Sequence, residues 1–291
     1  MALLLSEASP DGVADVSCAV MHDLQPAEGE TLDPIVGDWS VFQLRKGHRF
    51  SVDDVACAWR GSVAAPNATL LLDIGCGIGS AGLTALHLHP GAHLTAVEAQ
   101  DISHALFSRS IRYNGLQDRV ELHRGDLRDH IALPEGATFE LITGTPPYMP
   151  VGKGVMSPNP QRAHARMELR GSIFDYCAAA RRWLAPGGRF CFVMTAWDER
   201  TELAPAAHGL VVVERMDIIF REGREPHICT MVCARVEDVD EDTARHSFTL
   251  TVRDKDGEYT PEYQVMRTAM GKGGSGGQAR RAGRGTAASD T

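Results

Sequence analysis

The residues best suited to chemistry in this chain lie at 69–79, where an apolar run ends in an acid and three alternating glycines follow. Asp73 comes just before the turn, and the glycines are Gly75, Gly77 and Gly79. Glycine lets the backbone approach a ligand with no Cβ in the way, and the helix expected next offers free N–H groups to polar atoms. The pattern therefore predicts a strand–turn–helix site for a cofactor.

The glycine spacing alone is ambiguous, because Gly77, Gly79 and Gly82 also satisfy the G-x-G-x-x-G spacing of dinucleotide-binding proteins. The residues that follow separate the two kinds of site. Glu98 ends a second apolar run, and G-D-L at residues 125–127 follows a third. This order resembles the class I S-adenosylmethionine-dependent methyltransferases, and it makes a dehydrogenase the least favoured alternative.

The resemblance implies a role for each cofactor residue. The glycines would lie against the methionine and ribose portions of S-adenosylmethionine, and Glu98 would accept hydrogen bonds from the ribose hydroxyls. Asp126 would accept from the adenine amine while the Leu127 N–H donates to the ring. A turn glycine, a helix-capping acid and a turn aspartate are the structural alternatives. We expect the cofactor to be bound by Asp73, Gly75, Gly77, Gly79, Glu98, Asp126 and Leu127.

A second motif, Thr145-Pro146-Pro147-Tyr148, follows the fourth apolar run. It resembles the N-P-P-Y loop of methyltransferases that act on planar nitrogens, in which the Asn oxygen and the next carbonyl hold the N–H groups and the Tyr ring stacks on the target. Two prolines fix φ and remove N–H donors, which leaves a stiff loop with free carbonyls. We predict that Thr145, Pro146 and Tyr148 hold the methyl acceptor, with a Pro-Pro turn and a buried Tyr as the structural alternative.

Thr145 departs from the motif, because a hydroxyl reaches less far than an amide carbonyl and accepts with a different geometry. The departure leaves the target nitrogen open. It does not affect the expected methyl donor.

Other segments resemble the bacterial tRNA1(Val) adenine-37-N6-methyltransferase family over about residues 38–270. They are FSVDDV at residues 50–55, the segment behind it to Trp59, P-Q-R at 160–162, A-R at 165–166 and residues 259–263. The resemblance implies a base in structured RNA as the acceptor.

Arg162, Arg166 and Arg170 are spaced four residues apart, so one helix would place them on one face. Guanidinium groups beside a substrate loop suit phosphates or a carboxylate, and we expect Arg162 and Arg166 to bind substrate. A solvated face balanced by Glu168 is an equally good explanation.

Charge, cysteine and histidine usage bound the class of protein. The net charge of −9, from 38 acidic and 29 basic residues, argues against a protein coated in nucleic-acid-binding charge. The seven cysteines contain no C-x-x-C pair and are expected to be reduced, and the twelve histidines form no spaced ligand cluster, so no metal is expected. With neither a signal peptide nor a membrane span expected, we predict a cytoplasmic enzyme.

Alternating strands and helices predict an α/β, Rossmann-like seven-stranded methyltransferase sheet with helices on both faces. The strands are expected near 69–74, 93–98, 119–123, 139–143, 188–195, 211–220 and 227–236. The helices are expected near 79–89, 101–113, 168–184 and 198–207. Residues 221–226 are too few for a crossover helix, so the last two strands should pair as an antiparallel hairpin in a mostly parallel sheet.

Three regions are expected along the chain. Residues 1–37 form a partly irregular N-terminal extension, and residues 38–270 form the methyltransferase domain with a C-terminal strand near 247–253 and a helix near 261–270. Residues 271–291 form a Gly/Arg-rich tail with four basic residues against one acid, which should be disordered. This tail is either an RNA-contacting arm or a solvated end.

The leading hypothesis is an S-adenosylmethionine-dependent N-methyltransferase acting on an exocyclic amine of a base in tRNA or rRNA. Transfer would be direct, with no covalent enzyme intermediate, so the protein positions the reactants and stabilises changing charge. A protein glutamine side chain or a small molecule remains an alternative acceptor. A non-catalytic module that binds S-adenosylmethionine is the alternative from another class.

Overall fold

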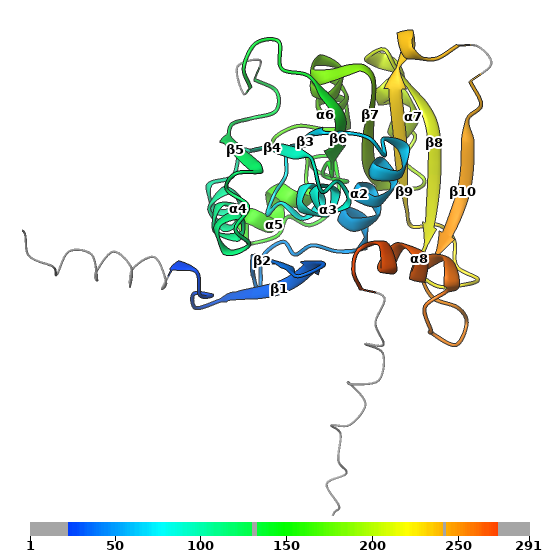
Figure 1. Cartoon of the computed structure of the whole chain (residues 1–291). Coiled ribbons are helices and arrows are strands. Elements are labelled where there is room, and N and C mark those ends of the chain that lie inside the picture. Colours follow the sequence, from blue (N-terminus) through cyan, green and yellow to red (C-terminus); the bar gives the residue numbers. More distant parts are fainter. Residues whose placement is uncertain (1–22, 130–132, 241–242, 273–291) are drawn as a thin grey trace, which may run out of the picture.

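The computed structural model describes residues 23–129, 133–240 and 243–272, and their strands form a hairpin and one eight-stranded sheet (Figure 1). The order of strands in the sheet is β10-β8-β9-β7-β6-β3-β4-β5. All seven expected strands are present, and β10 is an eighth. The predicted tail from residue 273 onward lies outside the described residues.

The parallel half of the sheet carries the apolar runs seen in the sequence. Its strands are β3 (Leu70–Ile74), β4 (His93–Glu98), β5 (Val120–Arg124), β6 (Phe139–Gly144) and β7 (Leu184–Thr195). A parallel strand that is covered on both faces needs apolar side chains on both sides, which explains the nearly continuous runs. Because these strands run in the same direction, their carboxyl ends meet at one edge of the sheet.

The expected antiparallel hairpin is confirmed and consists of β8 (Leu210–Ile219) and β9 (Ile228–Arg235). β9 also pairs antiparallel with β7. The added strand β10 (His246–Thr251) pairs parallel with β8 at the sheet edge. Only Leu250 of this strand is buried, so the local pattern gave little sign that it joins the main sheet.

Helices cover both faces of the sheet. One buried core combines α2 (Val52–Ala64), α3 (Ser80–Leu88) and α4 (Asp101–Tyr113), and the other lies under α6 (Ile173–Trp183) and α7 (Arg200–Ala207). The loop of residues 145–148, which we call the Pro-Pro loop, comes after β6, and the short helix α5 (Pro160–Arg166) follows it along the chain. Helix α8 (Pro261–Ala269) lies near the end of the described residues. None of the helices in the described ranges has the length and apolar character that a membrane span requires.

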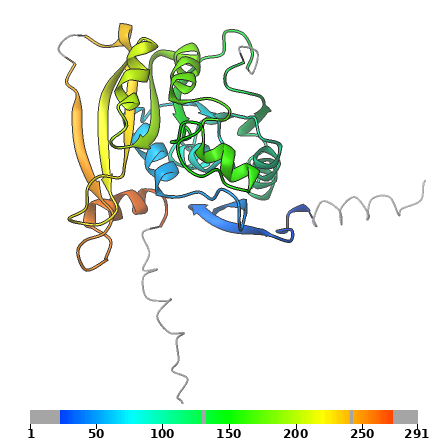
Figure 2. The same ribbon diagram turned by 180° about the vertical axis from the view of Figure 1, so that it is seen from behind.

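The N-terminal hairpin was not predicted. It consists of β1 (Glu30–Val36) and β2 (Trp39–Leu44) and crosses the boundary expected between residues 37 and 38. Arg109 of α4 pairs with Glu30 at 2.7 Å, and the Phe42 N–H donates to Ser110 Oγ at 3.0 Å. The hairpin and α8 lie at the same end of the molecule (Figure 2), where the Gly37 N–H donates to the Met270 carbonyl at 2.9 Å.

The helix expected over 168–184 begins later, at Ile173. Ser172 and Asp175 form a capping box there, with the Ser172 N–H donating to Asp175 Oδ2 at 2.7 Å. This box satisfies free N–H groups of the first turn and therefore fixes the start of the helix. α5 ends at Arg166, and the backbone of Met167 is extended, so the expected single helix face carrying three arginines is wrong.

Candidate active site

The glycine turn connects β3 to α3 with positive φ at Gly75 (62°), Gly77 (57°) and Gly79 (83°). A Cβ on Gly75 would lie 2.1 Å from the Tyr176 hydroxyl, and one on Gly79 would lie 2.1 Å from the Phe107 ring. A Cβ on Gly77 would meet nothing within 4 Å. Packing therefore requires glycine at positions 75 and 79, whereas Gly77 faces open space.

Asp73 lies behind this turn. It is not among the residues that line the cavity in front of the turn, which is described below. It is 1% exposed and accepts hydrogen bonds from the Gly82 N–H at 2.8 Å and from Thr143 Oγ1 at 2.9 Å. Burial raises the pKa of Asp73 to about 7. The carboxyl therefore fastens α3 to strands β3 and β6, and so positions the turn from behind.

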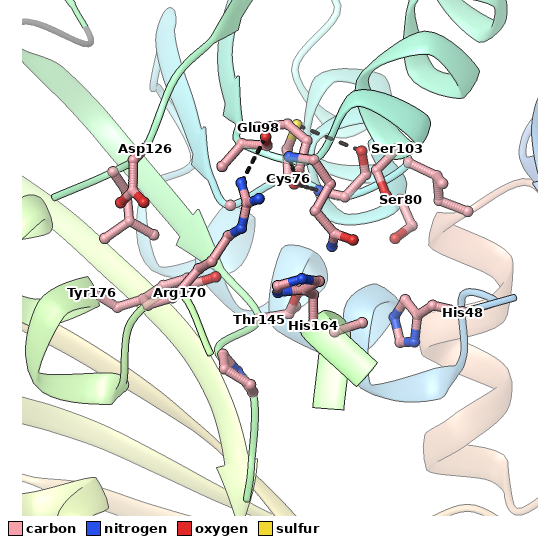
Figure 3. Close-up of a pocket in the computed structure, with 18 of the residues that line it drawn as sticks. His48, Cys76, Ser80, Glu98, Ser103, Asp126, Thr145, His164, Arg170 and Tyr176 are labelled. Carbon is pink, nitrogen blue, oxygen red and sulfur yellow. Dashed lines mark hydrogen bonds between the residues drawn. The ribbon is translucent and has the colours of Figure 1, made fainter. Parts of the chain in front are cut away.

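A cavity opens in front of the turn, with about 750 Å³ of empty space when its mouth is included. Figure 3 shows Asp126 and Tyr176 on one side of it and Ser80 and Ser103 on the other. We call it the turn cavity. The predicted residues that line it are Gly75, Gly77, Glu98, Asp126, Leu127 and Thr145.

Glu98 is held firmly on the wall of the turn cavity. Its Oε2 accepts from the Gly77 N–H at 2.8 Å and its Oε1 from the Gln100 N–H at 2.6 Å. Burial raises the pKa of Glu98, although these N–H groups and Arg170 act in the opposite direction. Each oxygen retains a lone pair, so the carboxylate can accept further hydrogen bonds from hydroxyl groups of a ligand.

Asp126 is tied to a neighbour that the sequence did not suggest. Both of its carboxylate oxygens accept hydrogen bonds from Arg128, at 2.8 and 2.6 Å. Arg128 lowers the pKa of Asp126, so the group is ionised at neutral pH. The adjacent Leu127 is buried in the same wall.

The Pro-Pro loop separates the turn cavity from a larger one of about 1530 Å³, again with its mouth included, which we call the loop cavity. Pro146 and Tyr148 line the loop cavity, and Pro147 lines the turn cavity. Four residues line both: His48, Asp54, Thr145 and Ala165. Thr145 therefore stands where the two spaces meet.

Tyr148 is anchored by a carboxylate from α2. Its hydroxyl donates to Asp53 Oδ2 at 2.8 Å. Burial raises the pKa of Tyr148 far above its ordinary range, and the charge of Asp53 adds to the effect, so the phenol keeps its proton. Tyr148 lines the loop cavity, where an aromatic side chain can stack on a planar group.

The three arginines lie in different surroundings. Arg162 donates to the Gly47 carbonyl at 3.0 Å and is not among the residues that line either cavity. Arg166 lines the loop cavity. Arg170 lines the turn cavity and donates to the Ala99 carbonyl at 2.9 Å.

Several lining residues were not predicted. Asp53 and Asp54 belong to the FSVDDV segment, which the sequence marked without assigning a role to either acid. Trp197 follows β7 and His227 precedes β9, and their rings lie 5.2 Å apart. Both positions are at the sheet edge where the parallel strands end, which is the one signal that could have identified them. Among the described residues, no group of three His, Cys, Asp or Glu side chains could hold a metal ion.

Comparisons with known proteins identify methyltransferases that are similar to this chain in sequence and in fold. Residues 61–203 match the methyltransferase small domain family. The tRNA1(Val) (adenine(37)-N6)-methyltransferase of Glaesserella parasuis is 28% identical over 208 residues, covering 70% of this chain and 83% of the relative. The protein of the same name from a Shewanella species is 26% identical over 225 residues, covering 73% and 92%. A predicted O-methyltransferase from Agrobacterium tumefaciens has the same fold, with a TM-score of 0.54 at 18% identity over 75% of this chain and 97% of its own.

Proposed function

We propose that this chain, a methyltransferase by family and fold, methylates an exocyclic amine of a base in structured RNA with S-adenosylmethionine as donor. The observation that carries the proposal is the junction of two cavities at Thr145. A donor in the turn cavity and an acceptor in the loop cavity would meet there. Holding both reactants in line supplies much of the rate acceleration in a direct transfer. With this substrate, we propose that the enzyme acts in the cytoplasm.

The turn cavity fits S-adenosylmethionine. Gly77 leaves open space beside the backbone, and Glu98 offers lone pairs to two neighbouring hydroxyls. His164 also lines the turn cavity, and its Nδ1 is buried and has no hydrogen-bond partner among the described residues. When bound, S-adenosylmethionine supplies a methyl group on a positively charged sulfur. Glu98 and Gly77 would hold the nucleoside part, and Asp126 and Leu127 the base.

The loop cavity suits a planar acceptor. Tyr148 lines it, and Trp197, which is 65% exposed, lies at its wall beside His227. Aromatic rings recognise bases that have left a nucleic-acid stack. The relatives reported above are named as methyltransferases of adenine 37 in tRNA1(Val), which favours an adenine amine in tRNA.

Incubation with methyl-labelled S-adenosylmethionine tests the proposal, with the RNA, protein and small-molecule fractions of a cell extract assayed in parallel. We expect label in tRNA, and its loss with Tyr148→Ala. Equal binding of S-adenosylmethionine by that variant and the parent would show that the fold is intact. Label confined to protein or small molecules would refute RNA as the acceptor. Binding without any label would favour a non-catalytic module.

A further inference from the structure

The loop cavity contains a pair of adjacent carboxyl groups, Asp53 and Asp54, in the first turn of α2. At position 145 the chain has a hydroxyl where the related loop has an amide carbonyl. A hydroxyl is a weaker and shorter acceptor for the N–H of an amine. The two carboxyl groups lie beside the Pro-Pro loop, in which that amide carbonyl is missing, since Asp54 and Thr145 line both cavities.

Asp53 has an oxygen to spare. Its Oδ2 accepts from the Tyr148 hydroxyl at 2.8 Å, while its Oδ1 is buried with no hydrogen-bond partner among the described residues. A buried carboxylate oxygen without a donor is costly, and native proteins pair nearly all such atoms. The atom is therefore suited to a donor that arrives with the substrate.

Asp54 has a different role. It is 5% exposed, and its Oδ2 accepts from the Ser51 N–H at 2.9 Å in the capping box of α2. Burial raises the pKa of Asp54 to about 8, and the neighbouring Asp53 adds to this rise. Asp54 is thus engaged in the start of α2, which leaves the unpaired oxygen of Asp53 as the acceptor.

The hydrogen bond to Tyr148 places Asp53 close to the ring on which the methyl-accepting base would stack. A base that stacks on Tyr148 has its amine in the plane of the stacked base, and the Asp53 carboxylate is fixed at the rim of the Tyr148 ring by the 2.8 Å hydrogen bond. A carboxylate near that rim can accept an N–H that projects from the edge of the stacked base. The carboxylate cannot accept a hydrogen bond from an ether oxygen or from a ring nitrogen that carries no hydrogen.

We propose that Asp53 compensates for Thr145, accepting an N–H of the target amine through Oδ1 and then taking its proton. The nitrogen lone pair forms the N–C bond as the C–S bond of the methyl sulfonium donor breaks. Sulfur keeps the electron pair of that bond and becomes a neutral thioether, and the surplus proton passes from nitrogen to Asp53. This role, which holds only if the chain methylates an amine as proposed above, restricts the acceptors to nucleophiles with an N–H.

Asp53→Asn is the informative variant, because the amide oxygen can still accept from Tyr148 but cannot take a proton. We expect kcat for tRNA methylation to fall at least about 100-fold, the usual range for loss of a general base. The affinity for S-adenosylmethionine should stay within about 3-fold, since its proposed site lies in the turn cavity. Asp118→Asn, at an exposed turn between α4 and β5, is the matched control and should keep full activity.

Two further readouts separate chemistry from structure. The acid limb of the wild-type pH profile of kcat should disappear in Asp53→Asn. Adding Thr145→Asn to that variant should restore at least about 10-fold of the lost kcat, because an amide carbonyl again faces the amine. A kcat within 3-fold of the parent, an unchanged acid limb, or loss of S-adenosylmethionine binding together with a lowered melting temperature would each overturn the role of Asp53.

The same assay distinguishes the two levels of the proposal. If the wild type labels no RNA, the proposed function itself fails. If the wild type labels RNA and Asp53→Asn labels it equally well, only the role of Asp53 fails.

Discussion

At the scale of single residues, Gly77 gives the sharpest test of the turn cavity. Its φ is 57° and its missing Cβ faces open space on the cavity wall. Gly77→Ala should weaken the binding of S-adenosylmethionine at least about 10-fold, since the methyl group occupies the ligand's space and the left-handed backbone costs roughly 1–2 kcal/mol. Isothermal titration calorimetry measures the change.

Gly91→Ala is the control for that substitution. Gly91 is exposed between α3 and β4, and its added Cβ would also meet nothing within 4 Å. Its affinity should equal that of the parent. Equal affinities for Gly77→Ala and Gly91→Ala would show that the donor binds elsewhere.

Trp197 tests the acceptor side. Stacking of a base on an aromatic ring contributes about 1–3 kcal/mol, so Trp197→Ala should raise KM for tRNA by about 5-fold to 100-fold and leave S-adenosylmethionine binding unchanged. Trp197→Phe should recover most of the loss. Leu203→Ala, at another exposed apolar side chain (56%), should have no effect. Equal KM values for Trp197→Ala and the parent would remove Trp197 from the RNA contact.

Many of these residues could be proposed from the sequence because their spacing encodes local structure. Gly77 lies in the turn after β3, Glu98 ends β4, and Tyr148 lies in a loop after β6, so each is placed by its own element. Asp73 was expected on the cofactor, yet its carboxyl turns inward, which strand position alone cannot tell. Asp53 was not assigned a role because its significance depends on Tyr148, 95 residues away.

At the scale of elements, Asp73 fastens α3 to the sheet, and its raised pKa has a consequence for stability. The folded protein holds a proton at Asp73 up to about pH 7, whereas the unfolded chain releases it near its ordinary value of 3.8. The contribution of this proton to the free energy of unfolding is therefore fully present at low pH and is lost as pH rises toward 7. Each pH unit in this window removes about 1.4 kcal/mol.

Asp73→Asn should remove this dependence. An amide can still accept from the Gly82 N–H and can donate to Thr143 Oγ1, so both present contacts persist with one reversed. Relative to wild type, its free energy of unfolding should increase with pH by about 1.4 kcal/mol per unit between about pH 5 and 7. Urea denaturation at several pH values measures this difference. A difference that stays constant with pH would mean that Asp73 is ionised throughout.

Elements with strong local patterns were predicted well, and those defined by distant partners were not. The strands β3 to β6 and helix α4 lie within a residue or so of their expected bounds, whereas β7 begins at Leu184, four residues before the expected start at residue 188. Contacts between segments far apart in the sequence define the remaining features. These are the N-terminal hairpin, the place of β10 in the main sheet and the separation of α5 from α6. The spacing of Arg162, Arg166 and Arg170 suggested one helix, but the extended backbone at Met167 ends it.

At the scale of the whole molecule, both cavities lie at the edge where the parallel strands end, as ligand sites in open α/β sheets generally do. The glycine turn follows β3, Glu98 ends β4, and the Pro-Pro loop follows β6. The antiparallel β9 places His227 at the same edge. One fold thereby brings a donor site and an acceptor site together although their residues are scattered over much of the chain.

The net charge of −9 bears on how RNA would be bound. An acidic body disfavours extensive phosphate contact, so recognition would rest on the stacked base and a few guanidinium groups such as Arg166. RNA binding should therefore depend weakly on salt.

The most direct test of the account is the identity of the methylated nucleoside. tRNA labelled by the wild-type enzyme is digested to nucleosides and analysed by mass spectrometry. The account predicts a methyl group on an exocyclic amine, with N6-methyladenosine as the product and no such product from Tyr148→Ala. A methyl group on a ring nitrogen without hydrogen, on carbon or on a ribose oxygen would contradict it.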